Sequence, residues 1–112
     1  MTGYTTNLTS TLYTLLATLE QAVGFNLQIT SGYRTPEHNK DVGGVENSEH
    51  TMDPAHAVDI AVANGHQRYL LVLHALGLGV VRLGIGNTFV HLGVSPDHPQ
   101  RVIWTYYHDT KP

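Results

Sequence analysis

The chain has 112 residues, a formal net charge of −3 and no cysteine. This length suits one compact domain with a single core, so we expect residues 1–112 to form one domain. Only 13% of the residues are charged and the six Lys and Arg residues are scattered, which argues against a nucleic-acid-binding protein. Without cysteine, any metal site must use His, Asp or Glu. No segment approaches the roughly 18 apolar residues of a membrane span, and we expect no signal peptide.

The first half of the chain is predicted to contain a helix, a strand and a long loop. Apolar residues recur at helical spacing over residues 8–23, with Asn7 as the expected N-cap and Gly24 as the stop. Residues 25–30 alternate apolar and polar side chains, as a half-buried strand does. Residues 35–54 show no sustained periodicity, and a loop this long in a small domain is usually functional.

The second half is predicted to be rich in β-structure, with one further helix. Residues 55–62 predict a short strand that carries Asp59, and residues 64–76 predict a helix with Asn64 as its cap. That helix is expected to bury Leu70, Leu73 and Leu76. Further β-segments are expected at residues 79–85, 89–94 and 102–107, separated by turns. The pattern indicates an α+β fold, with helices packed on a mainly antiparallel sheet.

His50, Asp59 and His91 are candidate metal ligands. Catalytic zinc sites typically take three nitrogen or oxygen ligands and leave a fourth position for water, so two His and one Asp are sufficient. Each residue alone has a simpler explanation, because a His in an apolar strand is more often a hydrogen-bonded core residue. An isolated Asp is more often a cap or an ion-pair partner. Metal binding is therefore a hypothesis about the three residues together.

Five short motifs follow one another along the chain. They are SGYRTPEHN at residues 31–39, VGG at 42–44, NSEH at 47–50, AVD at 57–59 and FVHL at 89–92. In this order they resemble the peptidase M15 family of zinc D-alanyl-D-alanine carboxypeptidases and related peptidoglycan peptidases, including phage endolysins. The resemblance extends over residues 31–106 and implies the fold that Hedgehog signalling domains share with D-Ala-D-Ala peptidases.

The resemblance also implies a site and a partner. His50, Asp59 and His91 would bind Zn²⁺, and Arg34 would hold a carboxylate or carbonyl of the substrate peptide. A guanidinium can hold a carboxylate through two hydrogen bonds, although an ordinary structural ion pair is the alternative for Arg34. The implied partners are peptidoglycan peptides, with assembly into a virion or another protein complex as a further expectation. By the same likeness, the protein would be phage-encoded or bacterial and act at the bacterial cell wall.

The spacing of the ligands departs from the family pattern. Ala55 stands where the family has Gly, and His50 and Asp59 are nine positions apart, as though residues 51–54 included a two-residue insertion. A loop can absorb such an insertion at little cost. We therefore expect both ligands to keep their places while the cleft is reshaped.

A residue for proton transfer is missing from its usual places. Many relatives carry an acidic residue or His a few positions before the last metal-binding His, or an Asp two positions after it. This chain has Thr88, Phe89 and Gly93 there, and none of them can act as a general base near neutral pH. The usual proton-transfer residue is therefore absent or relocated.

His56 is a weak candidate for that role, or for an extra zinc ligand, because a His titrates near neutral pH. On a strand, however, its side chain would lie on the face opposite Asp59. Glu49 and Asp53 are other candidates in the loop. The remaining histidines are expected at the surface or on helices: His38, His66, His74, His98 and His108. Four aromatic residues could line a cleft but are expected to pack in the core: Tyr33, Trp104, Tyr106 and Tyr107.

Three functions are compatible with these patterns. The favoured one is a zinc peptidase that cuts peptidoglycan stem peptides, either as a D,D-carboxypeptidase or as an endopeptidase. The second is a catalytically impaired binding or structural protein, such as a phage virion component, which keeps the fold and the metal. The third is a small domain without zinc, in which the His and Asp residues serve packing and hydrogen bonding alone.

Overall fold

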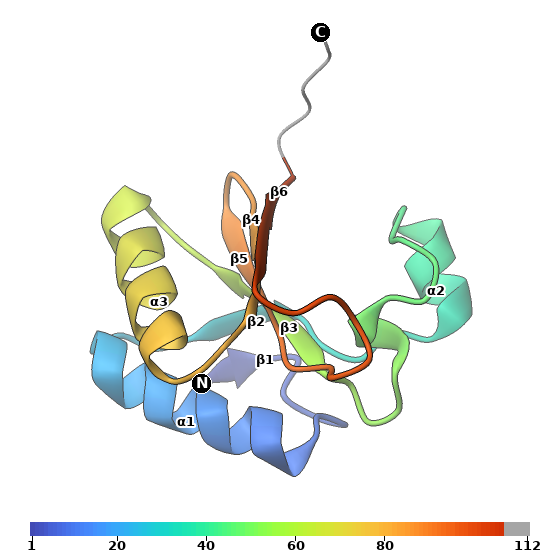
Figure 1. Ribbon diagram of the computed structural model, residues 1–112, viewed down its shortest axis with the longest axis horizontal. Coiled ribbons are helices and arrows are strands. Elements are labelled where there is room, and N and C mark those ends of the chain that lie inside the picture. Colours follow the sequence, from blue (N-terminus) through green and yellow to red (C-terminus); the bar gives the residue numbers. More distant parts are fainter. Residues whose placement is uncertain (107–112) are drawn as a thin grey trace, which may run out of the picture.

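A six-stranded mixed sheet organises the chain (Figure 1). The computed structural model describes residues 1–106. The strands lie side by side in the order β1 (Thr2–Gly3), β2 (Gln28–Ser31), β3 (Ala57–Ala61), β5 (Phe89–Gly93), β4 (Arg82–Ile85) and β6 (Val102–Thr105). The three inner pairings are antiparallel and the two outermost pairings are parallel. The α+β prediction is therefore confirmed, with parallel pairing added at both edges.

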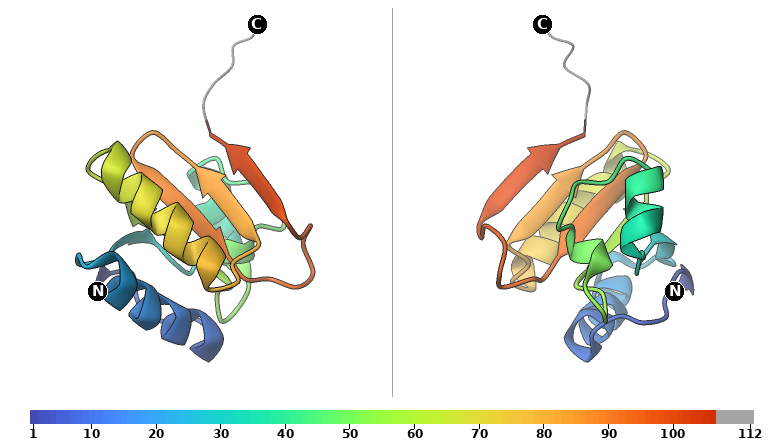
Figure 2. Two further views of the ribbon diagram at one scale, coloured as in Figure 1. Left: turned by 60° about the vertical axis from the view of Figure 1, so that its left-hand side comes forward. Right: turned by 90° about the vertical axis from the view of Figure 1, so that its right-hand side faces the viewer.

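Two helices cover one face of the sheet. These are α1 (Ser10–Val23) and α3 (Gly65–Gly77), which contact each other. In the left-hand view of Figure 2, α3 stands in front of the sheet and α1 lies below α3. Their apolar sides bury the core together with alternate residues of the inner strands. The fully buried members of this core include Leu12, Leu16, Leu19, Leu71, Val58, Ile60, Leu83, Val90 and Leu92.

The opposite face carries shorter elements. They are α2 (Pro36–Asp41) and the 3₁₀ helix η1 (Glu49–Thr51), seen in front of the sheet in the right-hand view of Figure 2. Because side chains alternate along a strand, the neighbours of the core residues in β3, β5 and β4 project toward this face. The polar side chains of the inner strands therefore meet α2 and η1, away from the helical core.

The predicted loop over residues 35–54 is wrong in part, because it contains both α2 and η1. Thr35 caps α2 by accepting a hydrogen bond from the backbone N–H of His38, and Pro36 occupies the first helical turn. This Thr-Pro pair is a helix-start signal. Apolar periodicity did not reveal α2 and η1, because both are too short for apolar residues to recur at helical spacing.

The bounds of α1 also differ from the prediction at its start. The helix begins at Ser10 and its N-cap is Thr9, whose hydroxyl accepts from the backbone N–H of Leu12. Asn7 has a φ of 54°, so its backbone is not in the extended conformation of an N-cap. Gly24 ends the helix with a φ of 79°, as predicted.

In α3 the cap is as predicted, but the buried side is predicted only in part. Asn64 accepts from the backbone N–H of Gln67. Leu70 is half-buried against the core, whereas Leu73 and Leu76 are 46% and 49% exposed. Leu71 and Ala75, one turn apart, face the core instead. Leucines lie all around this helix, so periodicity alone did not identify the buried side. None of the helices described is both long and apolar enough to cross a membrane.

Candidate metal centre

Asp59 and His91 meet because their strands are paired in register. They are direct partners in the antiparallel β3–β5 ladder, and their chain neighbours Val58 and Val90 are fully buried in the helical core. Alternation then directs Asp59 and His91 to the opposite face. Nδ1 of His91 lies 3.0 Å from Oδ1 of Asp59.

His50 reaches the same point from η1. The Ser48 hydroxyl caps η1 by accepting from the backbone N–H of His50. The backbone N–H of Arg34 donates to the carbonyl of His50, and Nδ1 of His50 lies 2.7 Å from the carbonyl oxygen of Gly32. These two bonds attach η1 to the end of β2. Nε2 of His50 then lies 3.3 Å from Oδ1 of Asp59, so the nine-position spacing does not separate these two side chains.

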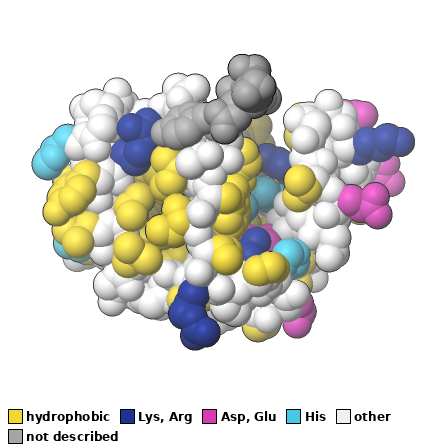
Figure 3. All heavy atoms as spheres, turned by 45° about the horizontal axis from the view of Figure 1, so that its top comes forward, with side chains coloured by type: hydrophobic (Ala, Val, Ile, Leu, Met, Phe, Trp, Pro, Cys, Tyr) yellow, Lys and Arg dark blue, Asp and Glu magenta, His cyan; other side chains and the backbone are white. Residues whose placement is uncertain are grey.

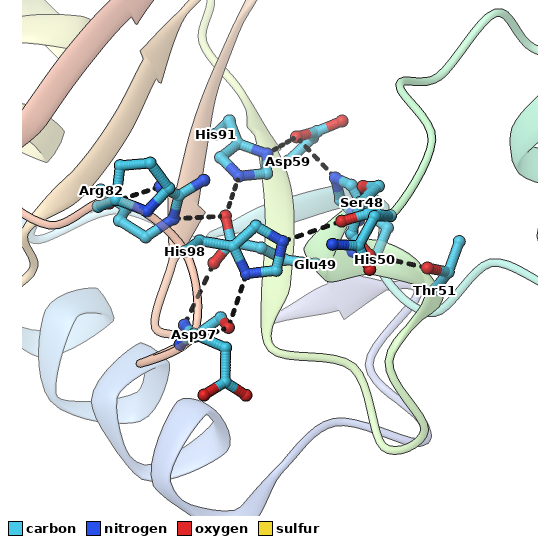
Figure 4. Close-up of polar contacts among 12 residues, drawn as sticks. Ser48, Glu49, His50, Thr51, Asp59, Arg82, His91, Asp97 and His98 are labelled. Atoms are coloured by element: carbon cyan, nitrogen blue, oxygen red, sulfur yellow. Dashed lines mark hydrogen bonds and ion pairs between the residues drawn. The ribbon is translucent and has the colours of Figure 1, made fainter.

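One ligand atom from each of His50, Asp59 and His91 lies within 4.8 Å of the other two (Figure 4). The outer nitrogen of each imidazole faces an acceptor, which is the Gly32 carbonyl for His50 and the Glu49 carboxylate for His91. A neutral ring that donates there presents its other lone pair to Asp59. Two lone pairs and a carboxylate then face one another and need a proton or a cation between them. This donor set fits a divalent metal ion such as zinc.

Glu49 lies beneath His91 and is only 2% exposed. Its Oε1 lies 3.1 Å from Nε2 of His91, and its Oε2 accepts a hydrogen bond from the backbone N–H of Ser95. Nε of Arg82 lies 2.9 Å from Oε1, which is an ion-pair distance without hydrogen-bond geometry. Burial would raise the pKa of Glu49, but the bonds from His91 and Ser95 outweigh it and lower that pKa below its usual value.

Arg34 lies on the other side of Asp59. Its Nη2 is 3.4 Å from Oδ2 of Asp59, while Nε and Nη1 donate to Ser31 and Asn39. The guanidinium is thus an ion-pair partner of a candidate ligand and also lines the cavity next to it. Burial would raise the pKa of Asp59, but hydrogen bonds from His50 and His91 lower it well below its usual range.

A cavity of about 790 Å³ lies above these residues. The segment of residues 42–48, which joins α2 to η1, forms one wall, and Phe89, Trp104 and Tyr106 from the sheet form another. Figure 3 shows a hollow on this face of the molecule. Histidine side chains (cyan) lie within the hollow, and hydrophobic side chains (yellow) lie along one of its sides. A molecule the size of a short peptide could therefore enter the cavity and reach His50, Asp59 and His91.

Trp104 and Tyr106 correct the expectation that the strand aromatics pack in the core. Both line the cavity, and Tyr106 is 43% exposed. The sequence places them on or just after a strand but does not show that this face is left uncovered by the helices. Tyr33 is half-buried and is not part of the cavity lining, whereas Tyr107 lies outside the described residues.

His98 is a second correction, because it also lines the cavity instead of lying free at the surface. Its Nδ1 is 2.7 Å from Oγ of Ser95 and its Nε2 is 2.8 Å from the carbonyl oxygen of Asn47. It therefore ties the segment after β5 to the loop before η1. Of the other histidines, His38 and His66 are exposed, His74 is half-buried on α3, and His108 lies outside the described residues.

The other two candidates for proton transfer lie away from the three ligand atoms. Nδ1 of His56 is 3.1 Å from the carbonyl oxygen of Pro54, and the residue does not line the cavity. It lies in a bend immediately before β3, outside the strand on which Asp59 lies. Asp53 is exposed and accepts a hydrogen bond from Asn7. Proton transfer by His56 is therefore not supported by its position.

Zinc is expected to stabilise the fold more as the pH rises from about 5 to about 8. Burial would lower the pKa of His91, but hydrogen bonds to Asp59 and Glu49 outweigh it and raise that pKa. In the metal-free protein, protonation of His91 therefore stabilises the folded state. This contribution to the free energy of unfolding is complete below the pKa that His91 has in the unfolded chain, and it is lost as the pH rises through the raised pKa of the folded protein. Zinc must displace that proton. Thermal unfolding with and without zinc measures the effect, and a pH-independent shift would contradict this account.

Comparison with known proteins identifies the family. No curated protein matches the chain significantly. A family model described as Peptidase M15 matches residues 2–93, which include β1 to β5 and all three candidate ligands. This match covers more than half of the chain and agrees with the motifs and with the α+β architecture. The chain therefore belongs to the peptidase M15 family.

Proposed function

We propose that this protein is a zinc-dependent peptidase that hydrolyses stem peptides of peptidoglycan, as a D,D-carboxypeptidase or an endopeptidase. The observation that carries the proposal is the convergence of His50, Asp59 and His91 on one point at the floor of a cavity. Membership of the peptidase M15 family supports it. On this proposal the protein acts at the bacterial cell wall, either free or within a phage particle.

The side chains around the cavity have complementary tasks in this proposal. His50, Asp59 and His91 hold the zinc ion, which supplies Lewis acidity toward a peptide carbonyl. Arg34 orients the peptide through a carboxylate or carbonyl, because part of its guanidinium borders the cavity. Trp104 and the apolar wall around it exclude water from the bound peptide.

Activity against defined substrates tests the proposal. Zinc-loaded protein is incubated with purified peptidoglycan and with muropeptides that end in D-Ala-D-Ala, and the products are identified by mass spectrometry. Loss of a single terminal D-Ala indicates a carboxypeptidase, and opening of a cross-link indicates an endopeptidase. Cleavage should stop with a chelator and return with zinc. If protein with bound zinc cleaves no muropeptide, the peptidase proposal is wrong.

A catalytically impaired structural or binding protein is the second candidate, and the lack of a titratable group at the family's usual positions for the general base favours it. Thr88, Phe89 and Gly93 offer no titratable group, and both oxygens of Glu49 are engaged by other residues. Burial raises the pKa of Tyr106, so its hydroxyl stays protonated and cannot serve as a base. Stable zinc binding without turnover is the result that this candidate predicts.

The role of Arg34 can be separated from zinc binding with the substitution Arg34→Lys. Lysine keeps a positive charge beside Asp59 but loses the planar fork that holds a carboxylate through two hydrogen bonds. We expect the KM for a muropeptide to rise about tenfold, while the zinc Kd stays close to that of the unaltered protein. Steady-state kinetics and zinc titration measure both. If the zinc Kd changes and the KM does not, Arg34 acts only as the ion-pair partner of Asp59 and does not bind the substrate.

A further inference from the structure

Glu49 is a buried carboxylate whose position the proposed chemistry does not use. It comes from η1, immediately before the candidate ligand His50, yet its side chain extends under His91. A buried charge is costly unless it is paired and hydrogen-bonded. Figure 4 shows Glu49 on the opposite side of the His91 ring from Asp59, with contacts running from the ring to both carboxylates.

The contact with Glu49 fits one assignment of the His91 ring nitrogens. Nδ1 faces Oδ1 of Asp59 at 3.0 Å and Nε2 faces Oε1 of Glu49 at 3.1 Å. A metal ion beside Asp59 would exclude a proton from Nδ1, and the ring proton on Nε2 would then donate to Glu49. Nδ1 is then left with its lone pair directed to Asp59. His50 is held by a neutral carbonyl, that of Gly32. The two imidazoles therefore have outer partners of different charge, and His91 has the stronger one.

Glu49 is itself fixed from two further elements. The backbone N–H of Ser95, just after β5, donates to Oε2, and the guanidinium of Arg82 on β4 lies beside Oε1. Arg82 in turn donates from Nη1 to the carbonyl of Pro99. Each carboxylate oxygen of Glu49 therefore already accepts a hydrogen bond from the protein, and these bonds fix its place beside His91.

Gly93 leaves the space that this carboxylate fills. A Cβ atom at position 93 would lie far inside van der Waals contact with both Oε1 and Oε2 of Glu49. Residue 93 lies two positions beyond His91 on β5, so its side chain would point to the same face. Positions 49 and 93 therefore share one volume, and only one of them can carry a side chain into it.

We propose that Glu49 is a positioning residue for the metal site, which holds His91 with Nδ1 toward the ion and strengthens its lone pair as a ligand. Gly93 is the residue that admits it. Outer-sphere carboxylates of this kind typically change metal affinity by about 10- to 100-fold. The role of Glu49 rests on the proposed zinc site but not on catalytic turnover.

The test measures metal binding in four purified proteins: the unaltered chain, Glu49→Ala, Glu49→Gln and the double variant Glu49→Ala/Gly93→Asp. The zinc Kd is obtained by competition with a chromophoric chelator, and the visible spectrum of the Co²⁺-loaded protein reports the ligand geometry. We expect Glu49→Ala to weaken zinc binding about 10- to 100-fold and to alter the Co²⁺ spectrum. The double variant returns a carboxylate to the same volume and should recover most of the lost affinity.

Glu37→Ala is the matched control, since Glu37 is an exposed glutamate on α2 that is not part of the cavity lining. It should leave the Kd and the spectrum unchanged. If Glu49→Ala does not fold without metal, Glu49→Gln decides, because it keeps the volume and is expected to bind zinc about tenfold more weakly. An unchanged Kd and spectrum in Glu49→Gln, or no recovery in the double variant, would overturn the proposal. A wild-type chain that binds no zinc would instead overturn the proposed function.

Discussion

His50→Ala is expected to weaken zinc binding about 1000-fold and to abolish peptide hydrolysis. A four-ligand structural zinc site is worth roughly 10–16 kcal/mol in all, so one ligand represents several kcal/mol. Nε2 of His50 is one of the three converging atoms, and its ring lies outside the hydrophobic core formed by α1, α3 and the sheet. Circular dichroism should therefore show an intact fold while calorimetric titration shows the loss of zinc.

His66→Ala is the control for this prediction. His66 is an exposed residue in the first turn of α3 and is not among the converging ligands or the cavity lining. Zinc affinity and hydrolysis should both be unchanged in this variant. If His50→Ala binds zinc as tightly as the unaltered chain, His50 is not a ligand and the site has been wrongly assigned.

Gly93→Ala is expected to destabilise the fold by about 3 kcal/mol. The added methyl group would collide with both oxygens of Glu49, whose carboxylate cannot move aside without losing His91, Ser95 and Arg82. The variant must either displace a buried charge from its partners or shift β5 against η1. Chemical denaturation followed by circular dichroism gives the change in the free energy of unfolding.

Gly77→Ala provides a matched control for that substitution. A Cβ atom at Gly77, in the last turn of α3, meets nothing within 4 Å. Alanine is favoured over glycine in a helix by up to about 1 kcal/mol, so this variant should be as stable as the unaltered protein or slightly more stable. Equal stability of Gly93→Ala and the unaltered chain would show that Glu49 does not occupy the volume beside residue 93.

The parts of the fold that could be predicted from sequence are those with local signals. Gly24 and Asn64 mark helix ends through their own backbone and side-chain chemistry, and Asp59 and His91 each lie within a short apolar run that predicts a strand. Because the order of the motifs resembles that of a known family, the three ligands could be grouped from the amino-acid sequence alone. The convergence of Asp59 and His91 then follows from strand register, and that of His50 follows from the hydrogen bonds that attach η1 to the residues after β2; no single segment specifies either.

The features that sequence analysis missed depend on contacts between distant segments. Glu49 meets His91 across 42 positions of the chain, and His98 meets Asn47 across 51. Nothing around Glu49 in the sequence distinguishes a buried carboxylate from an exposed loop residue. Trp104 lies in a short segment that predicts a strand, but only the arrangement of α1 and α3 on the other face of the sheet leaves it at the cavity.

The metal position in a crystal of the zinc-loaded protein tests the central claim most directly. Anomalous scattering at the zinc edge should give one strong peak within bonding distance, about 2.0–2.2 Å, of Nε2 of His50, Nδ1 of His91 and an oxygen of Asp59. A peak bonded to other side chains, or no peak at the floor of the cavity, would contradict the proposed zinc site and the peptidase function that depends on it.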